Sequence, residues 1–127
     1  MQIDFEIAER YLVANVSGPY SLQGMRELID RIAEESAKLK IARVLIDVSH
    51  MTGNAMTVER FEYAQYATAK FQGRVEKCAA CAGPAQPLEP FTEVVAQNRG
   101  LRLRVFRERA EALDWLIAGA DSDSQPR

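Results

Sequence analysis

The stretch that most constrains the fold is Val44-Leu45-Ile46-Asp47-Val48, because it is apolar on both faces of a strand until Asp47. This pattern is typical of a central strand in a mainly parallel sheet, covered on both sides. The polar segment Ser49 to Asn54 predicts a turn after it, and a helical pattern that begins at Asn54 or Thr57 continues to Gln72. A strand that enters a helix through such a turn is the usual place for a site in an α/β protein.

Strand and helix patterns alternate along the rest of the chain. The other predicted strands are Ile3 to Ile7, Tyr11 to Val16, Val75 to Ala82 and Leu101 to Val105. Apolar residues at helical spacing predict a helix that Ser21 caps, a short helix around Phe91, Val94 and Val95, and a last helix with Ala112, Leu113, Leu116 and Ile117 on its apolar face. The three prolines between Gly83 and Pro90 predict a stiff loop.

This element order defines the expected fold class. The order ββαβαβαβα predicts an α/β protein with a single-layer mixed, mainly parallel sheet of about five strands flanked by four helices. Repeated strand–helix pairs with short loops require parallel strands with right-handed crossovers, and only the first strand should be antiparallel. Residues 1–118 are expected to form one domain, and the small, polar residues 119–127 a flexible tail.

Composition excludes several classes of protein. The chain has 127 residues, 47% of them hydrophobic and 27% charged, with a formal net charge of -2. Such a balance is ordinary for a globular domain and gives no electrostatic reason to expect nucleic acid as a partner. No apolar run approaches the roughly 20 residues of a membrane span, and the N-terminus lacks a leader pattern. We therefore expect a cytoplasmic protein without a cofactor.

Cys78 and Cys81 form a C-x-x-C spacing inside a predicted strand. Side chains three apart on a strand point to opposite faces, and their α-carbons lie roughly 10 Å apart, too far for a disulfide. A structural zinc needs four ligands, which two such cysteines and the single histidine do not supply. We therefore interpret both cysteines as small buried residues and predict no metal site.

His50 is the chain's only histidine and follows the predicted central strand. A general base would need an orienting acid and a nucleophile, and Asp47 and Thr52, although close in sequence, complete no triad motif. Asp47 is expected to accept hydrogen bonds from turn amides, and His50 to be a solvated loop residue. Since no phosphate-binding loop pattern occurs either, we predict no catalytic residue and no enzymatic activity.

The densest cationic run lies near the C-terminal end of the chain, at Arg99, Arg102, Arg104, Arg107 and Arg109. Glu108 and Glu111 interrupt it, and no exposed aromatic residues alternate with it as nucleic-acid binding would require. We interpret the run as a solvated strand face on which arginine stems cover apolar neighbours.

An ordered set of segments carries a family resemblance over nearly the whole chain. The segments are Val16-Ser17-Gly18 followed by Leu22, Val44 to Ser49, Cys78 to Gly83, and Phe106…Ala112…Trp115-Leu116. In these segments the chain resembles the STAS superfamily, named for sulfate transporters and anti-sigma factor antagonists. It is most similar to the SpoIIAA-like, STAS/SEC14 branch of small bacterial proteins.

The resemblance implies a phosphorylation switch, but this chain lacks the serine that usually accepts the phosphate. In phosphorylatable STAS domains an Asp-Ser pair at the start of the helix after the central strand carries the modified serine. The corresponding positions here are Ala55 and Met56, with Thr57 next. Thr57 is the alternative acceptor, but threonine is also a good N-cap, which is the interpretation that we favour.

The leading hypothesis is therefore a non-enzymatic regulatory or protein-interaction domain. Its candidate partner- or ligand-binding turn comprises Asp47, Ser49, His50, Thr52, Asn54 and Thr57. The alternative implied by the resemblance is a small hydrophobic or lipid-like ligand in a pocket beneath the second helix. A filled interior there would favour the first hypothesis, and an apolar cavity of roughly 300 Å³ or more the second. The partner is unknown, and a homodimer is left open.

Overall fold

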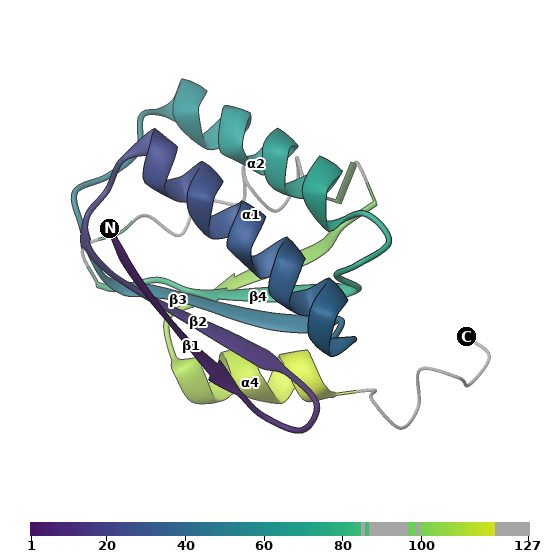
Figure 1. The fold of residues 1–127 in the computed structure, drawn as a ribbon. Helices are drawn as coiled ribbons and strands as arrows, with labels where there is room; N and C mark the ends of the chain where they lie inside the picture. The colour runs from purple at the N-terminus through teal and green to yellow at the C-terminus, as the bar shows by residue number, and fades with distance from the viewer. Residues whose placement is uncertain (85, 87–96, 99, 119–127) are drawn as a thin grey trace.

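The computed structural model describes residues 1–84, 86, 97–98 and 100–118, which build a five-stranded sheet with helices on both faces (Figure 1). In chain order the elements are β1 (Gln2–Ile7), β2 (Leu12–Pro19), α1 (Leu22–Leu39), β3 (Arg43–Thr52), α2 (Thr57–Phe71), β4 (Lys77–Cys81), β5 (Arg102–Phe106) and α4 (Arg109–Ile117). None of the helices in these ranges is long and apolar enough to cross a membrane.

The sheet topology confirms the predicted fold class. The strands lie in the order β1-β2-β3-β4-β5, with β1 antiparallel to β2 and every other neighbouring pair parallel. Sequential order with right-handed crossovers places α1 and α2 on the same face of the sheet, and α4 packs on the opposite face (Figure 1). The helix expected around Phe91, Val94 and Val95, the loop from residue 87 to Pro90 and the tail 119–127 lie outside the described residues.

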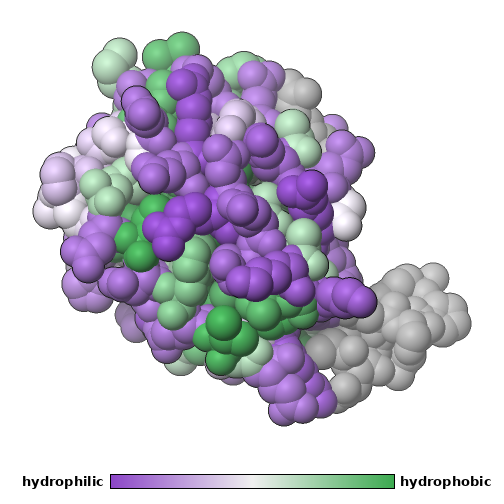
Figure 2. Space-filling model, in the orientation of Figure 1, coloured by the Kyte–Doolittle hydropathy of each residue, from purple (hydrophilic) through white to green (hydrophobic). Residues whose placement is uncertain are grey.

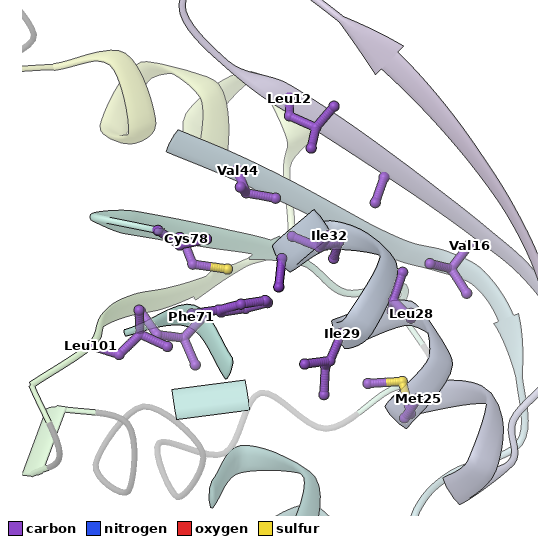
Figure 3. Close-up of a cluster of buried hydrophobic side chains, with 14 residues drawn as sticks. Leu12, Val16, Met25, Leu28, Ile29, Ile32, Val44, Phe71, Cys78 and Leu101 are labelled. Atoms are coloured by element: carbon purple, nitrogen blue, oxygen red, sulfur yellow. The ribbon is translucent and has the colours of Figure 1, made fainter. Parts of the chain in front are cut away.

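The main core lies between the sheet and the helices α1 and α2. Leu12 and Val16 of β2, Val44 of β3 and Cys78 of β4 are buried there against the apolar stripe of α1. Figure 3 shows the labelled side chains of the sheet and of α1 converging, with Phe71 among them. Burial of this stripe stabilises α1, since each fully buried large apolar side chain contributes roughly 1.5–3 kcal/mol.

A smaller core lies on the other face, beneath α4. Alternate strand residues supply it, namely Val13 of β2, Leu45 of β3, and Ala79 and Cys81 of β4, against Ala112 and Leu116 of α4. Val44 and Leu45 therefore point to opposite cores, which confirms a central strand covered on both sides. Cys78 and Cys81 also belong to different cores, as predicted, and burial raises the pKa of the Cys78 thiol to about 12.

Two sequence-based boundaries were wrong in the same way. We expected β2 to end at Val16 and the turn after β3 to begin at Ser49, but the strands end at Pro19 and Thr52. The two extensions pair with each other, Ser17 with His50 and Pro19 with Thr52, and the amide of Tyr20 donates to the carbonyl of Thr52 at 2.8 Å. This pairing keeps both segments extended, although their residue types favour turns.

The predicted N-cap residue is confirmed for α1 but was wrong for α2. The Ser21 hydroxyl accepts a hydrogen bond from the Gly24 amide at 2.9 Å, which is the expected N-cap. At α2 the N-cap is Met56, so the interpretation of Thr57 as the cap was wrong. The Glu59 carboxylate accepts from the Met56 amide at 3.2 Å, and Thr57 is the first helical residue.

The C-terminal end of α4 is stabilised by two cations from distant strands. Lys77, buried on β4, donates from Nζ to the carbonyls of Trp115 at 2.5 Å and Ala118 at 3.1 Å, and Nζ lies 4.3 Å from the centre of the Trp115 ring. Arg43, buried on β3, donates from Nη1 to the carbonyls of Leu116 at 2.6 Å and Ala118 at 3.2 Å. Both positive charges lie at the negative end of the helix dipole.

Candidate binding site at the carboxyl edge of the sheet

The parallel strands β2 to β5 bring their carboxyl ends to one edge of the sheet, beside the start of α2 (Figure 1). The predicted site residues gather there in two layers. Asp47 is buried and Ser49 half-buried, whereas His50, Thr52, Asn54 and Thr57 are exposed. The register between β2 and β3 shifts here, because Asn15 pairs with Asp47 but Ser17 pairs with His50. Such a bulge redirects the side chains that follow it.

Asp47 is the charged centre of the buried layer. Its Oδ1 accepts hydrogen bonds from the amide of Ser49 at 3.0 Å and from the Ser49 hydroxyl at 2.6 Å, which confirms the expected bonding to a neighbouring amide. Arg109 donates to Oδ2 at 3.0 Å. Burial alone would raise the pKa of Asp47, but the bonds from Ser49 and the charge of Arg109 outweigh it, so this pKa lies below its ordinary value.

His50 is exposed, as expected, although it lies in β3 and not in a loop. Its Nδ1 lies 3.3 Å from the Ser49 hydroxyl, which already donates to Asp47. The serine therefore stands between the acid and the imidazole, whereas a nucleophilic relay needs the imidazole in the middle. Across the residues that the structure describes, no group of three or more His, Cys, Asp or Glu side chains gathers to hold a metal ion.

Arg109 is a site residue that the sequence did not reveal. From the first residue of α4 it reaches three strands, donating to Asp47 on β3, to Asn15 Oδ1 on β2 at 2.9 Å and to Glu6 Oε2 on β1 at 3.0 Å. The Asn15 amide also donates to Glu6, at 2.5 Å. The signal that could have found this cluster is Asp47 itself, since a buried carboxylate requires a cationic partner.

The arginines of the cationic run have different roles: one covers aromatic rings and two make specific polar contacts. Arg104 lies over the rings of Phe106 and Trp115, at 5.3 and 5.9 Å, which confirms the predicted covering of apolar neighbours. For Arg107 and Arg109 that interpretation was wrong, because both make specific polar contacts at the carboxyl edge. Arg99 lies outside the described residues.

Arg107 and Gln86 connect the ends of β3, β4 and β5. Arg107 donates to the carbonyls of Gly83 and Gln86, and the Gln86 amide donates to the Val48 carbonyl at 2.8 Å. The Gly83 amide donates to Gln86 Oε1 at 2.6 Å. A Cβ on Gly83 would lie 2.9 Å from the Ser49 carbonyl oxygen, so only glycine fits against this part of the edge.

The start of α2 exposes large apolar side chains next to the polar turn. Met56 is 66% exposed, Val58 64% and Phe61 39%. Figure 2 shows apolar atoms at the end of the molecule where α2 begins. Single exposed apolar residues are ordinary, but several within six positions of one helix start form a candidate contact patch. We call Met56, Val58 and Phe61 the apolar patch.

A cavity of about 160 Å³ lies beneath α2, between this helix, α1 and the sheet. Its described lining is mostly apolar and includes Met25, Ile29, Val48, Met51 and Phe71. The interior is thus not completely filled, yet the cavity is smaller than the roughly 300 Å³ that we expected of a pocket for a drug-sized or lipid-like ligand.

Comparisons with known proteins agree with this geometry. The strand order β1-β2-β3-β4-β5, with only β1 antiparallel, and the helices on both faces define a single α/β sheet domain (Figure 1). The family model described as SpoIIAA-like matches residues 11–117, and the chain therefore belongs to the SpoIIAA-like family. No curated protein sequence matches the chain.

Solved structures share the fold at low sequence identity. An uncharacterised DUF3478-family protein from Shewanella loihica PV-4 with a SpoIIAA-like fold is 20% identical, with a TM-score of 0.60 over 91% of this chain and 92% of its own. A serine-to-glutamate variant of Moorella thermoacetica RsbS is 14% identical, with a TM-score of 0.58 over 95% and 99% of the two chains. The anti-sigma factor antagonist SpoIIAA in its unphosphorylated form is 13% identical, with a TM-score of 0.53 over 92% and 99%.

Proposed function

We propose that the protein is a non-enzymatic regulatory domain that binds a protein partner through the carboxyl edge and the start of α2. The contact surface comprises the exposed residues of the predicted turn, His50, Thr52, Asn54 and Thr57, together with the apolar patch. SpoIIAA, which shares the fold, is an anti-sigma factor antagonist, and this supports a regulatory role for a domain of this family. A cytoplasmic location and a homodimer stay predictions.

The observation that carries this proposal is the exposure of Met56 and Val58 beside those polar residues. Protein interfaces place apolar side chains at the centre and polar groups at the rim. Next to the polar residues, the buried Asp47 carboxylate pairs with the partly exposed Arg109 at 3.0 Å, which joins β3 to α4 behind this surface.

Serine substitution of Met56 and Val58 together is expected to abolish co-purification of the partner from native cells. The melting temperature should change little, because both side chains are exposed and surface changes cost within about 0.5 kcal/mol. Alanine substitution of His50, Asn54 and Thr57 together should have the same outcome. The matched control is Ile7→Ser, since Ile7 is equally exposed on β1, far from α2 in sequence, and should retain the partner. If the double serine variant and the triple alanine variant both still co-purify with the partner, the surface is wrongly assigned.

The proposed binding does not depend on phosphorylation of Thr57. The Thr57 hydroxyl is exposed and accepts a hydrogen bond from Arg60 Nη2 at 3.1 Å, and Ala55 and Met56 occupy the positions of the usual acceptor pair. We expect intact-mass and peptide spectra of protein from its native cell to show no phosphate at Thr57. Stoichiometric phosphate there would reinstate the switch.

A second candidate function is the binding of a small apolar ligand, and the cavity beneath α2 favours it. Its lining is apolar and comes from both helices and the sheet, so a ligand would replace missing packing contacts in the main core. The cavity lies on the inner side of α2 and the apolar patch on its exposed side, and Asn54, just before this helix, belongs to both sites.

A further inference from the structure

We propose that the cavity beneath α2 binds a small amphiphile, with a single ring or a short acyl chain in the apolar part and one carboxylate-like head beside Arg60. The inference rests on the second candidate function and specifies its ligand. Three properties of the cavity lead to it: its size, the chemistry of its lining and its position under α2.

The size of the cavity limits the apolar part of the ligand. Apolar cavities of about 150 Å³ accommodate one benzene ring, and a cavity of about 160 Å³ is in the same range. The two acyl chains of a phospholipid need several times this volume. Met25 and Met51 line the cavity, and their unbranched side chains adapt to ligands of slightly different shape.

The polar part of the lining sets the charge of the head group. Arg60 and Asn54 line the cavity, and no aspartate or glutamate does so within the described part of the chain. Arg60 Nη2 also donates to the Thr57 hydroxyl at 3.1 Å, but the guanidinium keeps its positive charge. Gln86 also lines it, but its amide group already bonds to Val48, Met51 and Gly83. In an apolar surrounding an arginine attracts an anionic oxygen strongly, and its planar donors match a carboxylate. An ammonium head would meet repulsion.

Tyr63 adds a second group to the same lining. A tyrosine hydroxyl keeps its proton at neutral pH and is available as a donor, and burial raises the pKa of this phenol further. Arg60 and Tyr63 lie three residues apart on α2 and therefore on neighbouring positions of one helix face. Together they supply a charge and a hydrogen-bond donor for one carboxylate.

The position of the cavity connects the ligand to the partner surface. Ala64 and Ala67 of α2 line the cavity, and the same helix carries the apolar patch on its exposed side. A ligand that packs against the inner side of α2 would stabilise this helix, and with it the surface that the partner contacts.

The four methionines of the chain give a direct test by methyl NMR. Met25 and Met51 line the cavity, whereas Met1 and Met56 do not. Titration with benzoate should shift the methyl resonances of Met25 and Met51 strongly, and those of Met1 and Met56 much less. Benzylamine, of matched size and opposite charge, should bind at least tenfold more weakly, and dioctanoylphosphatidylcholine should not bind.

Three variants separate specific binding from a general effect on the fold. Arg60→Gln should weaken benzoate binding about tenfold, and Arg74→Gln, an exposed arginine just after α2, should leave it unchanged. Ala80→Leu, which fills the cavity from β4, should abolish it. If Ala80→Leu does not fold, Ala67→Met fills the same cavity from α2 and carries the test.

The outcomes distinguish this inference from the function on which it rests. Equal binding of benzylamine and benzoate, unchanged affinity in Arg60→Gln, or binding of the diacyl lipid would overturn the proposed ligand class but retain a ligand site. If no probe shifts Met25 or Met51, the cavity binds no ligand and the second candidate function fails with it. Partner binding is tested separately by co-purification, and neither outcome of the ligand titration decides it.

Discussion

Replacing Lys77 with methionine is expected to lower the free energy of unfolding by about 3 kcal/mol, because a buried charged donor that bonds two helix carbonyls is lost. Methionine retains the apolar stem but leaves the carbonyls of Trp115 and Ala118 without the ammonium. α4 has no basic residue in its own last turn, so no local side chain can replace Lys77 there. Arg43 on β3 still bonds the Leu116 carbonyl at this end in the variant.

Urea denaturation followed by tryptophan fluorescence measures this effect at the helix itself. Trp115 is the only tryptophan of the chain, and its ring contacts the Lys77 ammonium. Lys70→Met is the matched control, since Lys70 is largely solvated on α2 and its ion pair with Asp30, at 3.4 Å, should contribute at most about 1 kcal/mol. An unchanged urea midpoint for Lys77→Met would show that the ammonium does not stabilise α4.

The fold could be predicted from the sequence because it depends on local patterns of burial. The run Val44 to Val48 identified the central strand, the apolar stripe of α1 identified the helix that covers it, and Ser21 marked where this helix begins. Each of these patterns is contained within one element. The ends of β2 and β3 were missed because their extensions pair with each other, and such pairing is not visible in either segment alone.

The polar contacts of the site could be predicted only in part, for the same reason. The bonds of Asp47 to Ser49 join residues two apart, and the sequence indicated them. Arg109 is 62 positions from Asp47 and 103 from Glu6, and Lys77 is 38 from Trp115. Within a run of arginines or a strand, nothing distinguishes these cations from solvated ones. Their roles follow from the packing of α4 on the sheet.

Arg109→Met is expected to lower the free energy of unfolding at pH 7 by about 2 kcal/mol, because it leaves the buried Asp47 carboxylate without its cation. The value is set below that of a fully buried pair, since the Arg109 side chain is 38% exposed and solvent screens its charge, whereas Asp47 is only 6% exposed. The serine bonds to Asp47 remain in the variant.

The pH dependence of this effect has a definite sign. In the wild-type protein the pKa of Asp47 is lower in the folded state than its ordinary value of 3.8, so its contribution to stability is present above pH 3.8 and is lost as pH falls through the lower folded pKa. Arg109→Met removes part of the cause of that shift. The difference in stability between the two proteins should therefore be largest near neutral pH and should shrink below about pH 4.

A double-mutant cycle tests whether the loss of stability comes from the interaction between Asp47 and Arg109. The cycle compares Asp47→Asn, Arg109→Met and the double variant by urea denaturation at pH 7, where a coupling energy of at least about 1 kcal/mol is expected for groups in contact. Arg102→Met is the control, because Arg102 is exposed and its ion pair with Glu76 is long, at 3.9 Å. Coupling near zero, or a stability difference that does not change with pH, would mean that Arg109 acts through packing and not through the charge of Asp47.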